Sequence, residues 1–165
     1  MDISHHVVPI RQPNRNDCWA AALAMVLRLR TGDPVGEVKL RAHGVHINPN
    51  GSIPSDSVPI LARTLRLQLV NLQNPAQLLS TPLLERVLRG STAAGFGYFN
   101  YPGSDSARSV ELQSAQHVLL FYRLSGRESD PTVHIIDPYT GTRFEYPMSE
   151  INENLGAVDF FIYGL

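Results

Sequence analysis

Residues 12–32 read QPNRNDCWAAALAMVLRLRTG and contain the only cysteine of the chain, Cys18. Asn16 and Asp17 are residue types that cap helices, and the run after them is rich in Ala, Leu, Met and Arg, which favour a helix. Gly32 is typical of a helix end, so the pattern places Cys18 in the first turn. The unpaired N–H groups and the positive dipole at a helix start favour a thiolate, which is the nucleophilic form of cysteine. A lone cysteine is often only a small buried hydrophobic residue, but this position favours a nucleophile.

The composition is that of one globular domain covering residues 1–165. Hydrophobic residues make up 43% of the chain, which is enough for a core, and the formal net charge is −1. Only 18% of residues are charged, and the 14 cations, of which Lys39 is the only lysine, form no basic run. We therefore expect no nucleic-acid partner and no attraction to an anionic membrane.

The cysteine count and the hydrophobic pattern lead us to expect no disulfide, no metal site, no cleaved signal peptide and no membrane span. One cysteine allows neither an internal disulfide nor a cysteine-based zinc site, so we expect no metal and no cofactor. The N-terminus lacks the pattern of a cleaved signal peptide, and no stretch approaches the roughly 18 apolar residues of a membrane span. The sequence thus predicts a soluble protein without membrane insertion. It leaves the oligomeric state open.

Two kinds of pattern divide the chain and predict an α+β domain. Residues of about 12–90 form the helical half, in which residues 31–54 read mostly as loop, a helix runs from about 55 to 67, and one or two helical turns end at Gly90. Residues of about 93–165 form the sheet half, because short aromatic and β-branched runs alternate there with Gly, Pro, Ser and Asp. The polar segment 102–115 lies between the first two of these runs and is expected to be a loop near the site.

A cysteine nucleophile needs a base, and histidine has the suitable pKa. Four of the six histidines fall on expected loops or at the N-terminus, where we read them as surface residues rather than metal ligands: His5, His6, His43 and His46. The other two, His117 and His134, fall on expected strands. A hairpin between residues 117–124 and 132–137 places His117 opposite or diagonal to Asp137.

That register predicts a third member for the site, because a carboxylate beside His117 would orient the imidazole and stabilise its protonated form. Asp137 could instead simply begin a turn, and His134 remains an alternative base. An oxyanion formed during attack needs donors, and the Cys18 N–H and the side-chain amide of Gln12 are available upstream of the helix.

These residues carry a family resemblance. Gln12, the sequence DCWAA at residues 17–21, His117 at the start of HVLLFY, and IIDPYTG at residues 135–141 together resemble papain-like cysteine peptidases. The order and compact size are similar to those of bacterial C39-like peptidases, and the CWAA form to that of C70-family effector proteases. The resemblance covers residues of about 12–141.

The resemblance implies a papain-like fold, in which the catalytic helix packs against a C-terminal antiparallel sheet. It also implies that Gln12 supplies the oxyanion hole, Cys18 is the nucleophile, His117 is the general base and acid, and Asp137 orients His117, while Trp19 packs beside the nucleophile and contributes to substrate binding. The substrate would be a protein or peptide. A bacterial effector or toxin domain, cytoplasmic or delivered by a specialised secretion system, is implied as well, with a cognate inhibitor or immunity protein as a further partner.

The same residues are compatible with other outcomes. A papain-like site can deamidate a glutamine side chain or transfer an acyl group to an amine, because these reactions differ only in the amide that enters and the acceptor that follows. A catalytically silent module that binds a peptide in the cleft is an alternative of another class. The intact set of Gln, Cys, His and Asp favours an enzyme.

Overall fold

The computed structural model describes residues 1–73, 76–99 and 117–165 and has an α+β architecture, as the sequence predicts. The helical elements are α1 (Cys18–Val26), α2 (Pro34–Arg41), η1 (Ser55–Ser57), α3 (Val58–Thr64), α4 (Thr81–Leu88), α6 (Met148–Glu150) and η2 (Ile151–Leu155). The strands are β1 (Asp2–Ser4), β2 (Gln68–Asn71), β3 (Ala93–Phe99), β4 (His117–Ser125), β5 (Thr132–Asp137), β6 (Thr142–Pro147) and β7 (Gly156–Tyr163). The expected loop 102–115 lies outside the described residues.

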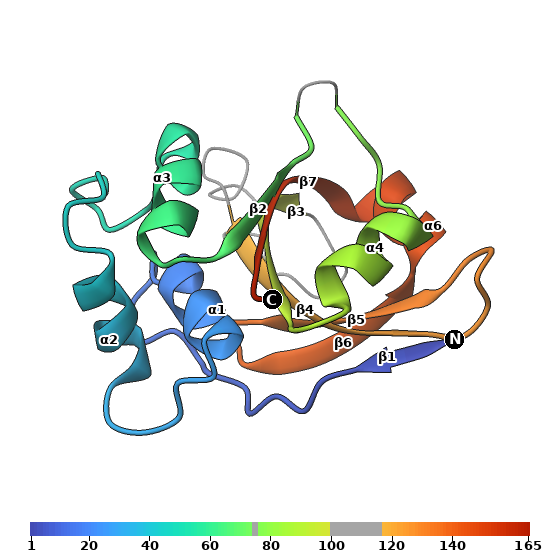
Figure 1. Cartoon of the computed structure of the whole chain (residues 1–165), viewed down its shortest axis with the longest axis horizontal. Coiled ribbons are helices and arrows are strands. Elements are labelled where there is room, and N and C mark those ends of the chain that lie inside the picture. The colour runs from blue at the N-terminus through green and yellow to red at the C-terminus, as the bar shows by residue number, and fades with distance from the viewer. Residues whose placement is uncertain (74–75, 100–116) are drawn as a thin grey trace.

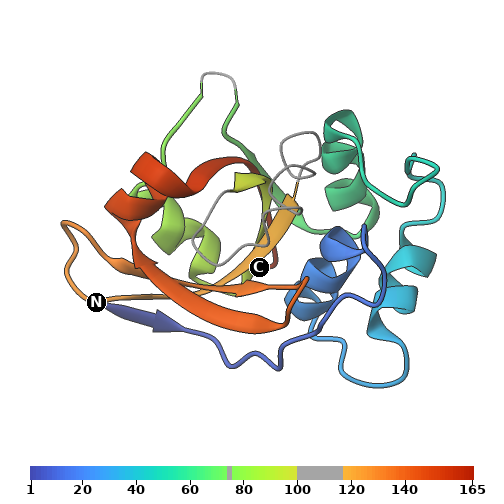
Figure 2. The same cartoon turned by 180° about the vertical axis from the view of Figure 1, so that it is seen from behind.

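The strands form one antiparallel sheet in the order β2-β7-β3-β4-β5-β6, and β1 pairs with the far end of β4. Figures 1 and 2 show α1, α2 and α3 grouped together at one side of the molecule, with the sheet and α4 at the other. The two middle strands of this order are β3 and β4, and α1 packs on both of them.

Each face of the sheet has its own hydrophobic core, since side chains of successive strand residues point to opposite faces. One core joins α1, α2 and α3 to strand residues that include Val118, Leu120 and Ile136. The other joins α4 and η2 to strand residues that include Leu119, Phe121 and Ile135. The expected division into a helical half and a sheet half is therefore only approximate, because α4 lies across the sheet from α1 to α3 and β2 joins the sheet.

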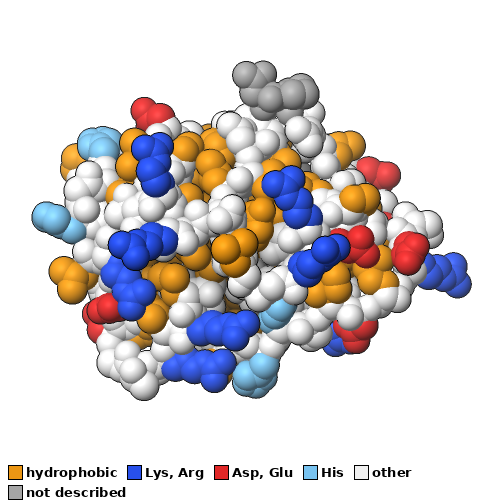
Figure 3. All heavy atoms as spheres, in the orientation of Figure 1, with side chains coloured by type: hydrophobic (Ala, Val, Ile, Leu, Met, Phe, Trp, Pro, Cys, Tyr) orange, Lys and Arg blue, Asp and Glu red, His pale blue; other side chains and the backbone are white. Residues whose placement is uncertain are grey.

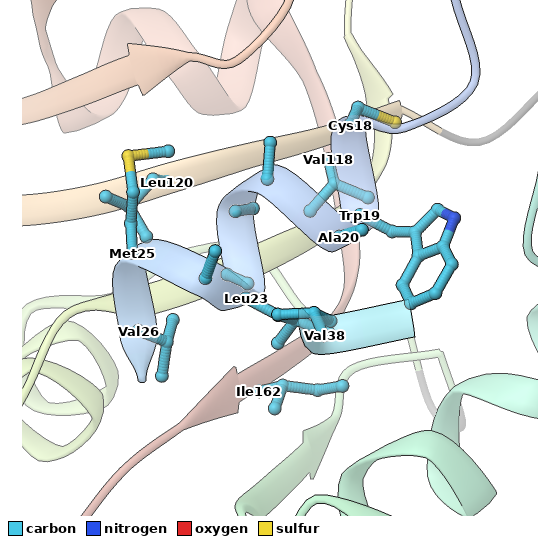
Figure 4. Close-up of a cluster of buried hydrophobic side chains, with 14 of the residues drawn as sticks. Cys18, Trp19, Ala20, Leu23, Met25, Val26, Val38, Val118, Leu120 and Ile162 are labelled. Carbon is cyan, nitrogen blue, oxygen red and sulfur yellow. The ribbon is translucent and has the colours of Figure 1, made fainter. Parts of the chain in front are cut away.

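Helix α1 is the most enclosed element of the fold, and every residue from Cys18 to Val26 is buried. Small alanines let this helix approach the sheet closely, as the packing in Figure 4 shows. The helix ends earlier than the sequence pattern suggests, because Arg28 adopts a left-handed conformation with φ of 57°. The N–H of Leu29 then bonds to the Ala24 carbonyl at 2.9 Å, which closes the last turn.

One helix was missed in the sequence. Residues 31–54 were expected to be mostly loop, and most of them are, but α2 forms within them because Asp33 caps the Gly36 N–H at 3.0 Å and Pro34 occupies the first turn. The neighbouring Gly and Pro residues hid this short helix signal. The N-terminal strand of the structure is β1, which pairs with β4.

None of the helices in the described part of the chain is long and apolar enough to cross a membrane. On the face drawn in Figure 3, Lys and Arg side chains occur singly or in small groups with uncharged surface between them.

Candidate active site

Cys18 is the first residue of α1 and is a free, buried cysteine, 7% exposed. Asp17 immediately precedes it, but its carboxylate makes no hydrogen bond to the helix N–H groups, so the expected capping role is wrong. The position of Cys18 at the helix start is nevertheless the one expected. The first N–H groups of a helix have no acceptor within the helix and point toward negative charge placed there.

His117 and Asp137 meet at the adjacent ends of β4 and β5. The His117 Nε2 atom lies 2.9 Å from Asp137 Oδ1, and the side chains are 4% and 1% exposed. Leu120 pairs with Ile136 in the register, so Asp137 lies diagonal to His117, as the hairpin arithmetic predicts. Cys18 lies within interaction range of the same imidazole, because its hydrogen-bonding and charge effects both raise the pKa of His117.

The Asp137 carboxylate fixes the orientation of this imidazole. A carboxylate can only accept, so His117 Nε2 carries the hydrogen, which leaves Nδ1 for the sulfur of Cys18. Asp137 Oδ1 also accepts from the Tyr139 N–H at 3.0 Å, which holds the carboxylate against the turn after β5. The ring is thereby held between two fixed groups.

The charged form of His117 is stabilised in this setting. Burial, the largest influence, lowers its pKa, but the hydrogen bonds and negative charges of Asp137 and Cys18 together raise it from 6.5 to about 9. His117 is therefore an imidazolium at neutral pH, facing Cys18 on one side and Asp137 on the other. This is the charge arrangement of a thiolate–imidazolium pair.

Gln12 lies beside these residues, but its amide is turned onto its own loop. Its backbone N–H donates to the Pro138 carbonyl at 2.7 Å, which ties this loop to the residue after Asp137. The side-chain nitrogen donates to the carbonyls of Asn14 at 2.9 Å and Arg15 at 2.6 Å. Gln12 Oε1 is buried without a hydrogen-bond partner among the described residues. Both amide hydrogens thus have acceptors, and donation to an oxyanion requires one of these bonds to break.

Trp19 is buried at the start of α1. The indole is 1% exposed, and the contribution to substrate binding that the resemblance implies stays a prediction. Its Nε1 donates to the Gly51 carbonyl at 3.0 Å, and the Asn16 amide donates to the Asn50 carbonyl at 2.9 Å. The loop at residues 48–52 is thereby fixed against the start of α1, and Figure 4 shows the indole beside Cys18 at that end of the helix.

Sequence reasoning missed Lys39, which forms an ion pair beneath the nucleophile. Its Nζ lies 2.6 Å from Asp17 Oδ1, and the lysine and aspartate side chains are 40% and 3% exposed. The Asn14 amide donates to the other carboxylate oxygen at 2.9 Å. Because α2 was not expected, nothing in the sequence placed Lys39 near Cys18. The sequence did contain a signal for the start of α2, namely Asp33-Pro34 followed by Glu37 in the first turn.

Replacing Lys39 by methionine is expected to lower the free energy of unfolding by about 1–2 kcal/mol, because the buried Asp17 carboxylate loses its counter-charge. Urea denaturation measures this change. The matched control is Arg41→Met, which removes an exposed pair with Glu37, 46% and 44% exposed, and should cost at most about 0.5 kcal/mol. Equal losses in the two variants would contradict a special role for Lys39.

Four of the other histidines bond to other residues or are exposed. His5 Nε2 is 2.6 Å from the Leu88 carbonyl, and His134 bonds to Ser125 and Glu145. His43 and His46 are exposed on the segment after α2. Within residues 1–73, 76–99 and 117–165, no group of three His, Cys, Asp or Glu side chains is placed to hold a metal ion.

Comparison with known proteins adds nothing to this geometry. No protein-family model matches the chain, and a search of curated proteins finds no match.

Proposed function

We propose that the protein is a thiol hydrolase with a papain-like fold that cleaves an amide bond in a protein or peptide. The observation that carries this proposal is the continuous contact from Cys18 through His117 to Asp137, with 2.9 Å between His117 Nε2 and Asp137 Oδ1. Nucleophile, base and orienting carboxylate within hydrogen-bonding reach are what covalent catalysis requires.

In the proposed reaction the Cys18 sulfur attacks the amide carbonyl and forms a carbon–sulfur bond. His117, which holds the proton at neutral pH, gives it to the leaving amine as the carbon–nitrogen bond breaks. Water then attacks the thioester and gives a proton to His117 as the carbon–sulfur bond breaks, which releases the acid and restores the thiolate–imidazolium pair. Asp137 keeps the imidazole oriented and stabilises its charge throughout.

The oxyanion of the tetrahedral intermediate would lie at the start of α1. The Cys18 N–H is one donor there, because the first turn of a helix leaves its N–H groups without acceptors in the helix. Gln12 is the proposed second donor, after its amide leaves the Asn14 or Arg15 carbonyl. Substrate binding would therefore have to compete with those two bonds.

Peptide-bond cleavage is our first choice of reaction. Deamidation of a glutamine side chain and acyl transfer to an amine would use the same residues in the same roles. The proposal that the protein is a bacterial effector or toxin domain rests only on the resemblance of its sequence to the peptidase families named above.

One observation favours a different class of function. Both amide hydrogens of Gln12 bond to carbonyls of its own loop, as expected for a catalytically silent module that binds a peptide beside Cys18 without cleaving it. The two functions differ in the reactivity of the thiol, which can be measured without knowing the substrate.

The test is alkylation of Cys18 by a low dose of iodoacetamide near pH 6, followed by intact-mass analysis. The chain has one cysteine, so the mass reports on Cys18 alone. We expect alkylation at least about 10-fold faster than that of glutathione under the same conditions, because the imidazolium stabilises the thiolate. His117→Ala should bring the rate down to that of the reference thiol. Cys18 left unmodified at pH 6 would contradict the hydrolase.

A further inference from the structure

A second chain of hydroxyl, imidazole and carboxylate crosses the sheet away from Cys18. Ser125 Oγ lies 2.8 Å from His134 Nε2, and His134 Nδ1 lies 2.9 Å from Glu145 Oε2. The three residues come from β4, β5 and β6, and His134 pairs directly with Glu145 in the register. Neighbouring strands therefore hold all three side chains on one face of the sheet.

The two partners of His134 determine its tautomer. The Glu145 carboxylate can only accept, so Nδ1 carries the hydrogen and Nε2 of the neutral ring is the acceptor. Ser125 must then donate its hydroxyl hydrogen to Nε2. This is the arrangement in which an imidazole can take the proton of a serine as the oxygen attacks an electrophile.

The surroundings keep the imidazole neutral and partly sheltered. His134 is 8% exposed, and burial, the largest influence, and Arg123 lower its pKa, against the opposing effects of Glu145 and Asp2. The Tyr122 ring packs against the imidazole with its centroid 6.0 Å away. A neutral imidazole is the form that can act as a base.

A cation lies on the same part of the sheet. Arg123 is the residue opposite His134 in the register, and its guanidinium bonds to Asp2 at 3.1 and 3.2 Å. Asp2 in turn pairs with Ser125 through β1. Once released from Asp2, this guanidinium could stabilise the oxyanion that forms when Ser125 attacks an ester or a phosphoryl group.

We propose that Ser125, His134 and Glu145 form a second nucleophilic centre that reacts at Ser125 with esters carrying a good leaving group. The Ser125 oxygen forms a bond to the acyl carbon, its proton passes to His134 Nε2, and the leaving alcohol takes that proton as its bond breaks. Water then releases the acid by the same route. This centre shares no residue with the proposed thiol hydrolase, and either can fail without the other.

The probe is diisopropyl fluorophosphate, applied to the whole protein in the Cys18→Ala background so that the thiol cannot react. We expect a single adduct in which the Ser125 oxygen is bonded to phosphorus and fluoride has left, located by peptide mapping. Ser149 is an internal control, because its hydroxyl bonds to the Asp130 carboxylate at 2.7 Å and has no imidazole partner among the residues that the structure describes. It should stay unmodified.

Variants then test whether Ser125, His134 and Glu145 act together. Ser125→Ala should lose the adduct, His134→Asn should slow labelling by on the order of 100-fold, and Glu145→Gln by about 10-fold. Glu145 has a side chain that is 64% exposed, so its substitution should leave the fold intact even if that of His134 does not. No adduct at Ser125, or Glu145→Gln labelling at the unsubstituted rate, would overturn the proposal.

Discussion

Replacing Cys18 by alanine is expected to abolish turnover, by on the order of 10⁴-fold or more, while the fold remains. No other thiol is present to replace the nucleophile, and the remaining groups of such a site give little catalysis on their own. The change removes one sulfur at the start of α1, where alanine fits the helix, so the free energy of unfolding should change by about 1 kcal/mol at most.

The measurement is a proteomic comparison of cell lysates treated with the unsubstituted protein and with Cys18→Ala. New N-termini that appear only with the unsubstituted protein would establish a peptidase, and Gln-to-Glu mass shifts would establish a deamidase. Thermal unfolding and circular dichroism of the variant serve as the control for folding. Activity retained by a folded Cys18→Ala protein would rule out the thiol hydrolase.

Replacing Asp137 by asparagine is expected to lower activity by on the order of 10²–10⁴-fold and to lower the pKa of His117 from about 9. Asp137 supplies a hydrogen bond and a negative charge that both raise this pKa, and without them burial, which lowers it, gains weight. The imidazolium that protonates the leaving group is then lost at a lower pH. Activity should therefore fall as the pH rises through about 9 in the unsubstituted protein, and it should fall at a lower pH in the variant.

The same pKa predicts how stability depends on pH. The folded protein binds the His117 proton more tightly than the unfolded chain does, so this stabilisation is fully present below pH 6.5. It is lost as the pH rises through about 9. Denaturant unfolding at a series of pH values should show this loss, and Asp137→Asn should show a smaller one.

NMR titration of the imidazole resonances measures the pKa of His117 directly. Asp130→Asn is the matched control, because Asp130 is an exposed carboxylate that bonds to Ser149 and makes no contact with His117 in the described structure. Its substitution should leave the His117 midpoint in place. An unchanged midpoint in Asp137→Asn would show that the carboxylate does not control the charge of the site.

Much of the fold could be predicted from local signals. Alternation and turn residues predicted β3 to β7 because each strand carries its pattern in a few consecutive residues. The hairpin between β4 and β5 is also local, so counting residues across it was enough to bring His117 to Asp137. The α+β class and the helix that begins at Cys18 follow from the same kind of evidence, while the catalytic roles stay predictions.

Other features depend on contacts between distant segments. Helix α2 was missed because a cap, Pro34 and two glycines gave a pattern that resembles a loop, and its stability comes partly from Val35 and Val38 packed into the core of α1. With α2 missed, the ion pair of Lys39 with Asp17 could not be foreseen. The placement of α4 across the sheet from α1 likewise depends on which sheet face its buried residues cover.

The stretch at residues 12–32 by itself determined a helix with a cysteine at its start and a glutamine upstream. Helix propensity and the spacing of Gln12 from Cys18 act within this one segment, so the sequence was sufficient. Only the tertiary structure decided that Asp17 turns away to Lys39, that the Gln12 amide engages Asn14 and Arg15, and that His117 bridges Cys18 and Asp137. Side chains form hydrogen bonds with the partners that folding brings within about 3 Å, and these partners depend on the fold of the whole chain.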